Sequence, residues 1–521
     1  MHVSRPTAGV LFLLMLPLAL MPTLAQDEFP YFETDNCPFE LPAPEAEGET
    51  YECGYLVVPE DRSDPDSPTV ELAVAIIYSV SNIPEADPLV YLAGGPGSGA
   101  LLEADLWAAS PLRADRDIIL LDQRGTGFSY PNLNCVELED EDAEDVIAAS
   151  IACRDRLLEA RVDLSAYNSA ASAADIEDLR LALEIDKWNV YGVSYGTRLA
   201  LTLMRDFPDG IRSVVLDSVY PPHVNAYEEQ PLNTFLALEV LFQGCAASIT
   251  CNEAYPQLGQ VFYDVVDQLN ATPFDDGEHG LIFGDDVSAT IIQSMYSTEV
   301  IPGLPLAIYL LAADEFEIGM TLLNGEIPPD EIVSLLSDDS GDNRSDDSGE
   351  DDGGDEGLIV DEDLLDELGD ISDAEGLYNS VECHDEVPFA DRRVAADLAR
   401  DIPASIRASE LASVDELIET CALWGAGTAD ARENEPVVSN IPTLVLAGEY
   451  DPVTPPSWAQ RAAEHLSQGY YYEFPGVGHS VIDAGDCPVA MITGFLDDPT
   501  SAPDSRCLER MSGPEFAVLE A

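Results

Sequence analysis

Short apolar runs rich in β-branched residues alternate along this chain with helical patterns, and this alternation constrains the fold more than any other feature. Residues 171–185 and 198–204 have the spacing of amphipathic or buried helices. The runs that predict strands are residues 69–79, 88–92, 117–121, 188–191, 213–216, 443–446 and 470–474. Because buried strands joined by helices form parallel sheets covered on both faces, we expect an α/β fold with a mostly parallel sheet.

The chain between the early and the late strands has a different pattern. Residues 221–436 are mainly helical, so we expect a helical cap inserted between two parts of a core, residues 26–220 and 437–521. Within the cap, residues 337–357 are a low-complexity acidic stretch. Such a stretch cannot bury apolar surface, which predicts a disordered insert. A calcium loop is the alternative, but the ligand spacing of a known calcium loop is absent.

The first 25 residues are typical of a secretory signal peptide. Basic residues precede an apolar run over residues 8–21, and Thr23-Leu24-Ala25 offers small residues where signal peptidase cleaves. The run is shorter than the roughly 20 residues that a membrane span needs, and Pro17 interrupts it. We therefore expect cleavage after Ala25, rather than a retained anchor, and an exported protein that is not attached to a membrane.

The cysteines agree with export, because disulfides persist in oxidising compartments. The chain has 10 cysteines, an even number. Zinc binding is the alternative, but the chain has no Cys-x-x-Cys and only 6 histidines, so we expect no metal site. Our hypothesis is that neighbours in sequence pair, although spacing alone does not prove connectivity: Cys37 with Cys53, Cys135 with Cys153, Cys245 with Cys251, Cys383 with Cys421, and Cys487 with Cys507.

The chain is strongly acidic, with 22 Lys and Arg against 100 Asp and Glu and a formal net charge of −78. A surface of this charge repels phosphate backbones, so the sequence argues against nucleic-acid binding. It favours positively charged substrates, although solubility alone is the simpler reason for the charge. The hydrophobic share of 46% is enough for a large core and too high for a wholly disordered chain.

The pentapeptide Gly192-Val193-Ser194-Tyr195-Gly196 follows a predicted strand and precedes a predicted helix. In this context a Gly-x-Ser-x-Gly sequence forms a sharp turn that exposes the serine hydroxyl at the edge of a sheet. The helix N-terminus adds free N–H groups and a favourable dipole. Ser194 is therefore the candidate nucleophile.

A serine nucleophile needs a base, and the base needs a carboxylate that orients it. His479 lies in a Gly-rich turn just after a predicted strand, and Asp451 lies at the end of another. The order Ser194, Asp451, His479 is that of the α/β hydrolases. We do not expect the other histidines of the mature chain to act as the base. His223 lies at the start of the cap, His279 and His465 are expected at the surface, and His384 beside Cys383 is expected to be a structural or pocket residue.

Acyl transfer also needs donors for the oxyanion that forms on the attacked carbonyl. Gly94-Gly95-Pro96-Gly97 follows a predicted strand, where the hydrolase fold places its second donor loop. We assign the backbone N–H groups of Gly95 and Tyr195 to this role, with Gly94 as the alternative to Gly95. A plain tight turn is the other reading of these glycines.

These motifs, together with Asp122-Gln123-Arg124-Gly125-Thr126-Gly127, resemble the proline iminopeptidase and tripeptidyl aminopeptidase family of exported α/β hydrolases. The resemblance runs from about Tyr51 to Cys507, and residues 487–507 look like the family's C-terminal extension. Many members have histidine before Gly-Gly-Pro-Gly, where this chain has Ala93.

The resemblance implies a serine hydrolase that releases N-terminal residues or short peptides through an acyl-enzyme, without a cofactor. It also implies that cap carboxylates hold the free ammonium of a peptide substrate, and Asp385 and Glu386 are the candidates. Arg124 is expected to shape the floor of the site. A carboxylic ester hydrolase with the same triad is the alternative function. The oligomeric state is left open.

Overall fold

The computed structural model describes residues 30–138, 145–275, 280–337, 358–360, 371 and 373–519. The expected leader, His279 and nearly all of the acidic stretch lie outside these residues. Within them, no helix is long and apolar enough to cross a membrane.

A nine-stranded sheet forms the centre of the described chain, in the order β1-β3-β4-β6-β5-β7-β8-β12-β13. The strands from β6 to β13 are parallel to one another, while β1, β3 and β4 add an antiparallel end. The α/β fold with a mostly parallel sheet is confirmed. The strands are β1 (Tyr31–Asp35), β3 (Tyr51–Pro59), β4 (Thr69–Ile77), β5 (Leu89–Leu92), β6 (Ile118–Leu121), β7 (Trp188–Val193), β8 (Ile211–Asp217), β12 (Thr443–Gly448) and β13 (Gly469–Phe474).

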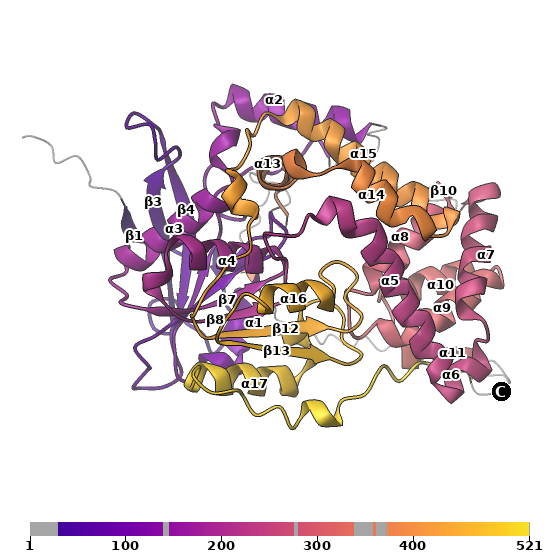
Figure 1. Ribbon diagram of the computed structural model, residues 1–521. Helices are drawn as coiled ribbons and strands as arrows, with labels where there is room; N and C mark the ends of the chain where they lie inside the picture. The colour runs from indigo at the N-terminus through magenta and orange to yellow at the C-terminus, as the bar shows by residue number, and fades with distance from the viewer. Residues whose placement is uncertain are drawn as a thin grey trace, which may run out of the picture.

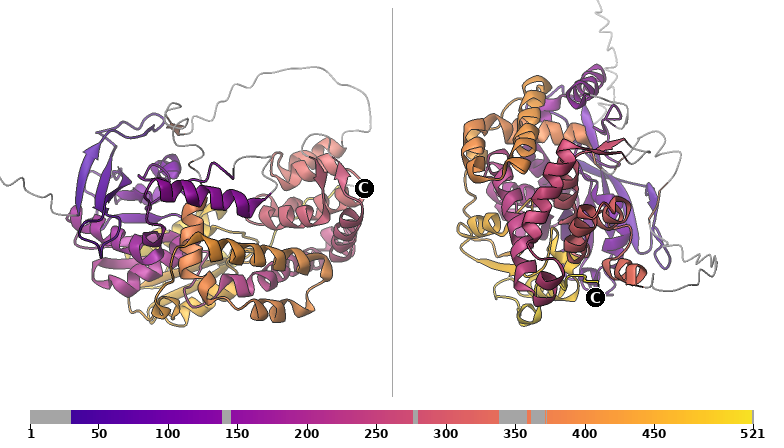
Figure 2. Two further views of the ribbon diagram at one scale, coloured as in Figure 1. Left: turned by 90° about the horizontal axis from the view of Figure 1, so that it is seen from above. Right: turned by 90° about the vertical axis from the view of Figure 1, so that its right-hand side faces the viewer.

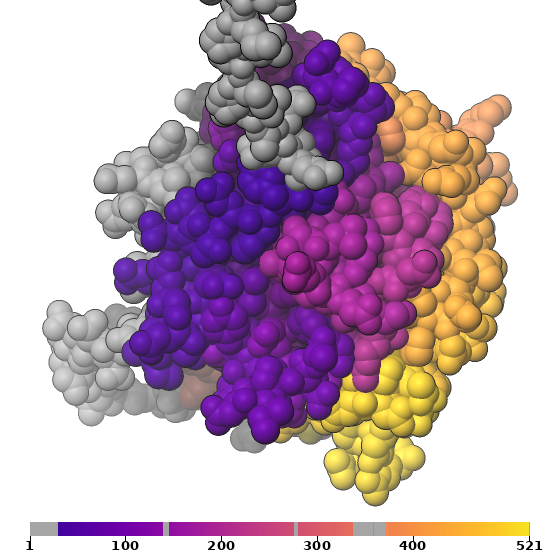
Figure 3. All heavy atoms as spheres, turned by 90° about the vertical axis from the view of Figure 1, so that its left-hand side faces the viewer, coloured from indigo at the N-terminus to yellow at the C-terminus, as the bar shows by residue number. Residues whose placement is uncertain are grey.

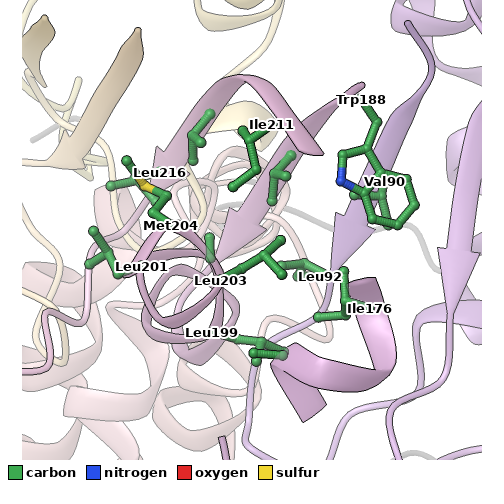
Figure 4. Close-up of a cluster of buried hydrophobic side chains, with 14 of the residues drawn as sticks. Val90, Leu92, Ile176, Trp188, Leu199, Leu201, Leu203, Met204, Ile211 and Leu216 are labelled. Atoms are coloured by element: carbon green, nitrogen blue, oxygen red, sulfur yellow. The ribbon is translucent and has the colours of Figure 1, made fainter. Parts of the chain in front are cut away.

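Helices cover both faces of this sheet (Figure 1). The helices that pack on the core strands are α1 (Ala104–Ala109), α3 (Ser169–Ala182), α4 (Tyr195–Asp206), α16 (Pro456–Ala463) and α17 (Asp486–Asp497). Helix α2 (Val146–Glu159) packs instead against α13 (Glu375–Asp385) and α15 (Ala404–Trp424). One apolar layer joins the sheet to α3, α4 and α16, and a second joins it to α1 and α17. Figure 4 shows part of the first layer, where Leu199 and Leu203 of α4 and Ile176 of α3 meet Val90 and Trp188 of the strands.

A set of helices stands between β8 and β12 in the chain. They are α5 (Ala226–Ala247), α6 (Ile249–Ala254), α7 (Leu258–Ala271), α8 (Gly284–Ser294), α9 (Leu304–Ala312), α10 (Phe316–Leu323), α11 (Pro329–Ser337), α13 (Glu375–Asp385), α14 (Arg392–Leu398) and α15 (Ala404–Trp424). Helices α5–α11 share their own apolar core. We call the helices from α5 to α15 the cap; its boundaries at 221 and 436 stay a prediction.

The views from other sides show how these parts sit together. Seen from above, the early strands lie at one end of the molecule and α7–α11 at the other (Figure 2). The face opposite those helices is formed by early residues in indigo and by magenta residues, with the C-terminal part in yellow at its lower edge (Figure 3). The chain end reaches the cap, since Ala517 N–H donates to the carbonyl of Pro302.

Two short strand pairs lie outside the central sheet. They are β2 (Phe39–Glu40) with β11 (Ile359–Val360), and β9 (Phe274–Asp275) with β10 (Leu281–Ile282). All ten cysteines form disulfides, and the five bonds join the pairs expected from their order in the sequence. The disulfide pairing hypothesis is therefore confirmed.

Candidate active site

Ser194 occupies a tight turn between β7 and α4. Its backbone has φ 55° and ψ −125°, a conformation that residues with a side chain rarely adopt. A Cβ added to Gly192 would lie 2.3 Å from the carbonyl oxygen of Gly196, and one added to Gly196 would lie 2.0 Å from that of Leu92. Only glycine fits at these two positions, which explains why the turn needs both.

The Ser194 hydroxyl is left free by the helix that follows it. A serine at a helix N-terminus usually accepts a hydrogen bond from the first turn, but Ser194 makes no such bond. The hydroxyl and N–H of Thr197 donate instead to the Ser194 carbonyl, at 2.6 and 2.9 Å. Ser194 borders a cavity of about 800 Å³ that His479 also lines.

His479 and Asp451 lie together at the ends of neighbouring strands. The Nδ1 atom of His479 is 2.9 Å from Oδ2 of Asp451. The other oxygen of Asp451 accepts hydrogen bonds from the N–H groups of Val453 and Thr454, at 3.0 and 2.9 Å. The Thr454 hydroxyl donates to Oδ2 at 2.7 Å. This carboxylate is thus fixed by three bonds, and it leaves Nε2 of His479 to exchange a proton.

The charges around His479 favour its protonated form. Burial acts against the imidazolium, but the charge and hydrogen bond of Asp451, with the charges of Asp217 and Asp483, raise the pKa of His479 above its usual value. The ring also packs against that of Tyr296 in the cap, with centroids 4.9 Å apart. A raised pKa makes the imidazole a stronger proton acceptor.

Ser194 and His479 face one cavity, but the structure gives no hydrogen bond between the hydroxyl and the imidazole in the part of the chain that it describes. Catalytic hydrogen bonds are often long without substrate and shorten during the reaction. The proton transfer between these two residues therefore stays a prediction.

The glycine loop after β5 lies directly beside the serine. A Cβ added to Gly94 would lie 3.1 Å from Cβ of Ser194, and Gly95 has a φ of +97°. The carboxylate of Asp122, at the end of β6, accepts the N–H of Leu101 at 2.9 Å and thereby holds the chain that leaves this loop. Tyr195 is the first residue of α4. Gly95 lines the cavity with Ser194, and Tyr195 directly follows Ser194 in the chain, but their role as oxyanion donors stays a prediction.

Asp385 and Glu386 lie away from this cavity and already have partners. Asp385 is bonded to Nδ1 of His384 at 2.7 Å and to the N–H of Ser169 at 3.1 Å. Glu386 pairs with Arg198 at 2.5 Å and accepts the Tyr220 hydroxyl at 2.7 Å. Their expected role in holding a substrate ammonium stays a prediction that no contact supports.

Other residues also have places that the sequence did not indicate. Arg124 lies fully buried behind the site, where it makes a two-bond contact with Asp175 at 2.7 and 2.8 Å, so it does not line the cavity. His465 was expected at the surface but is only partly exposed. Its half-buried ring packs edge-on against His223, with centroids 5.3 Å apart.

The sequence analysis missed three residues that support His479. Asp217 ends β8, and Thr454 follows Asp451 by three positions. Tyr296 belongs to the cap, and its carbonyl accepts the N–H of His479 at 3.0 Å. Asp217 could have been found as a carboxylate at the C-terminal end of a parallel strand; nothing in the sequence marks Tyr296. Among the residues that the structure describes, no cluster of His, Cys, Asp or Glu has the makings of a metal site.

The chain is similar in sequence to two known protein families and to several named proteins. Residues 87–244 match the model of the alpha/beta hydrolase fold, and residues 410–507 match the model described as TAP-like protein. The serine protease Hip1 of Mycobacterium tuberculosis is 26% identical over 496 residues, covering 87% of this chain and 86% of Hip1. The putative hydrolase YuaR of Escherichia coli is 24% identical, with 87% of each chain covered.

A tripeptidyl aminopeptidase of Streptomyces lividans is 30% identical over 242 residues, covering 42% of this chain and 44% of that protein. The region that matches the α/β-hydrolase model contains the turn with Ser194, and the region that matches the TAP-like model contains Asp451 and His479. Together with the sheet and its cap, these matches confirm the family that the motifs resembled. The chain therefore has the α/β-hydrolase fold in its core and a TAP-like segment in its C-terminal part.

Proposed function

We propose that this hydrolase is an aminopeptidase that acts outside the cytoplasm and releases N-terminal residues or short peptides. The observation that carries the proposal is the His479–Asp451 pair at 2.9 Å, whose histidine lines the same cavity as Ser194. The names of the Hip1 protease and the tripeptidyl aminopeptidase support peptide substrates. The five disulfides support an oxidising compartment.

In this proposal, Ser194 Oγ attacks the scissile carbonyl carbon while Nε2 of His479 takes the hydroxyl proton. The carbonyl oxygen becomes an oxyanion, which the N–H groups of Gly95 and Tyr195 stabilise. His479 then gives the proton to the leaving amine, and the peptide bond breaks to leave an acyl-enzyme. Water, deprotonated by His479, attacks the acyl group, and the serine leaves with the proton. Asp451 holds the imidazole and stabilises its charged form.

The walls of the cavity suit a substrate that carries a positive amine. Glu103, Asp373 and Asp483 all line it. Burial raises the pKa of Glu103 to about 7, against the hydrogen bonds from Tyr91 and Trp107, so this group is partly ionised near neutral pH. The other two carboxylates are exposed. Negative walls attract an ammonium and discriminate against its uncharged acylated form.

The test compares matched substrates. Aminoacyl and tripeptidyl anilides are offered with a free and with an acylated N-terminus, beside simple acyl esters, and kcat/KM is measured for each. The proposal predicts that acylation of the amine lowers kcat/KM by roughly 100-fold, the size of one lost charged contact in a cavity. Equal rates for free and acylated anilides, or hydrolysis of esters alone, would favour the ester hydrolase instead.

A further inference from the structure

One residue touches both the serine turn and the histidine loop. Asp217 is the last residue of β8, and β8 is hydrogen-bonded in the sheet between β7, which leads to Ser194, and β12, which leads to Asp451. Its side chain is fully buried. The backbone carbonyl of Asp217 accepts the N–H of Ser194 at 3.0 Å, so the residue fixes the turn that carries the hydroxyl.

The carboxylate of Asp217 binds the loop that follows His479. Oδ1 accepts the N–H of Val481 at 2.8 Å, and Oδ2 accepts the N–H of Ile482 at 3.0 Å. The next residue, Ser218, accepts the N–H of Ser480 on its hydroxyl at 2.9 Å. The three N–H groups that follow His479 in the chain are therefore all bound by Asp217 and Ser218.

Both segments that meet here, the loop after His479 and the end of β8, contain a residue in an unfavourable backbone conformation and need such support. Ser480 has a φ of 63° and Ser218 a φ of 56°, both in the left-handed region that residues with a side chain avoid. Such conformations persist where the surroundings fix them. The bonds to Asp217 and Ser218 supply that constraint directly beside the imidazole.

The opposite side of Asp217 is held by the core. The hydroxyl of Tyr191, on β7, donates to Oδ2 at 2.6 Å, and the ring of Tyr191 packs against Trp107 with centroids 5.6 Å apart. The carboxylate is thus bound by a rigid aromatic cluster on one side and by the histidine loop on the other.

We propose that Asp217 is a positioning residue for the reaction: it fixes the distance between Ser194 and His479 and adds its charge to that of Asp451 behind the imidazole. The charged and titratable groups that face His479 are Asp451 from the end of β12, Asp217 from the end of β8, and Asp483 from its own loop, and the Tyr296 ring of the cap packs against it. This inference rests on the proposed catalytic role of Ser194 and His479.

The experiment measures how fast a fluorophosphonate reacts with the full chain at a series of pH values. This reaction needs an activated serine but no particular substrate. Asp217→Asn keeps the shape of the side chain and removes its charge. We expect a plateau rate lower by roughly 10- to 100-fold, because small displacements of reacting groups cost that much. We also expect the midpoint of the acid limb to fall by about one unit, since a removed negative neighbour lowers the pKa of an imidazole.

Two further variants separate positioning from stability. Asp122→Asn removes a carboxylate that is equally buried at the end of β6 and that also binds backbone N–H groups, at 2.9 and 2.8 Å, but not those of the histidine loop. We expect its acid-limb midpoint to stay that of the unchanged chain. Ser218→Ala removes the acceptor of the Ser480 N–H without changing charge, so we expect a slower plateau with an unchanged midpoint.

The outcomes are distinct. If the unchanged chain does not react with the fluorophosphonate, the proposed function fails. If it reacts and folded Asp217→Asn keeps both its plateau and its midpoint, the inference about Asp217 is overturned. If Asp217→Asn does not fold, hydrogen exchange of the unchanged chain decides. If the amides of residues 480–482 exchange as slowly as those of β8, the positioning role of Asp217 is supported; if they exchange fast, it is overturned.

Discussion

Ser194 is the residue on which the proposed chemistry depends, because it is the only side chain that forms a covalent bond to the substrate in the proposed reaction. Ser194→Ala is expected to lower kcat by roughly 10⁴-fold or more, because removal of the nucleophile of a triad leaves only the oxyanion donors and binding. The measurement is anilide hydrolysis at saturating substrate. Ser467→Ala, at an exposed serine, is the control and keeps full activity. Residual activity near that of the control would mean that another nucleophile acts.

Asp451 fixes the ring of His479 through one short contact, so its effect is on orientation and charge. Asp451→Asn preserves the shape of the side chain but can present an N–H to Nδ1, which favours the wrong tautomer. We expect kcat to fall by about 10⁴-fold with little change in KM and in melting temperature. Steady-state kinetics and thermal melts of the same sample check this. A rise in KM alone would show that Asp451 binds substrate instead.

At the residue scale, the sequence was sufficient where local context defines a role. Ser194 follows from a pentapeptide with a strand before it and a helix after it, and Asp451 and His479 from their places after strands. Asp385 and Glu386 show the limit of this reasoning. Nothing in the sequence reveals that Ser169 and Arg198 lie against them, because these contacts join the end of α13 to the starts of α3 and α4, which are far away in the chain.

At the scale of the element, the elbow between β7 and α4 depends on its glycines. Gly196→Ala is expected to destabilise the fold by about 2 kcal/mol or more, because a Cβ there would lie 2.0 Å from the carbonyl oxygen of Leu92 and force α4 away from β5. The matched control is Gly494→Ala in α17, where an added Cβ would meet no atom within 4 Å outside the adjacent backbone of its own helix. That change is expected to stabilise the chain by about 0.5–1 kcal/mol. Equal effects of the two substitutions on chemical denaturation would contradict this reading of the elbow.

The strands around the site were predictable because each is a short apolar run that ends at a turn. The run at 443–446 became β12, and the helix expected over 171–185 became α3, which begins two residues earlier and ends three residues earlier. The early strands β1 and β3 were not predicted. In β1, three of the five residues are exposed, and its pairing with β3 is set by the sheet edge rather than by its own pattern.

At the scale of the whole molecule, the net charge of −78 acts on His479 in addition to its neighbours. A negative field favours the imidazolium, and His479 must be neutral to accept the serine proton. Activity is therefore expected to fall as pH decreases through a midpoint above the ordinary value of 6.5. Because salt screens distant charges, the midpoint is expected to move to lower pH between about 0.01 and 0.5 M salt. An acid limb at the same pH throughout would contradict this effect.

Several carboxyl groups of the core also link stability to pH. Burial raises the pKa of Glu382 and Asp122 to about 8 and about 7, above the values 4.5 and 3.8 of exposed groups. The folded chain therefore holds protons that the unfolded chain releases, and stability decreases as pH rises from about 5 to 8. We expect a lower melting temperature at about pH 8 than at about pH 5.

Glu382 offers a direct control for this pH dependence. Its Oε2 atom is buried and has no hydrogen-bond partner among the residues that the structure describes. Glu382→Gln removes the ionisation and keeps the shape, so it is expected to raise the melting temperature at high pH and to flatten its dependence on pH. A variant with the unchanged slope would show that other groups, or repulsion across the surface, cause the loss of stability.

The most direct test of the account is to react the native chain with a fluorophosphonate and to locate the adduct by peptide mass spectrometry. We predict one modified residue, Ser194, with labelling that is abolished in Ser194→Ala and strongly slowed in His479→Ala. An adduct on another residue, or labelling that does not depend on His479, would show that these side chains do not form a catalytic unit.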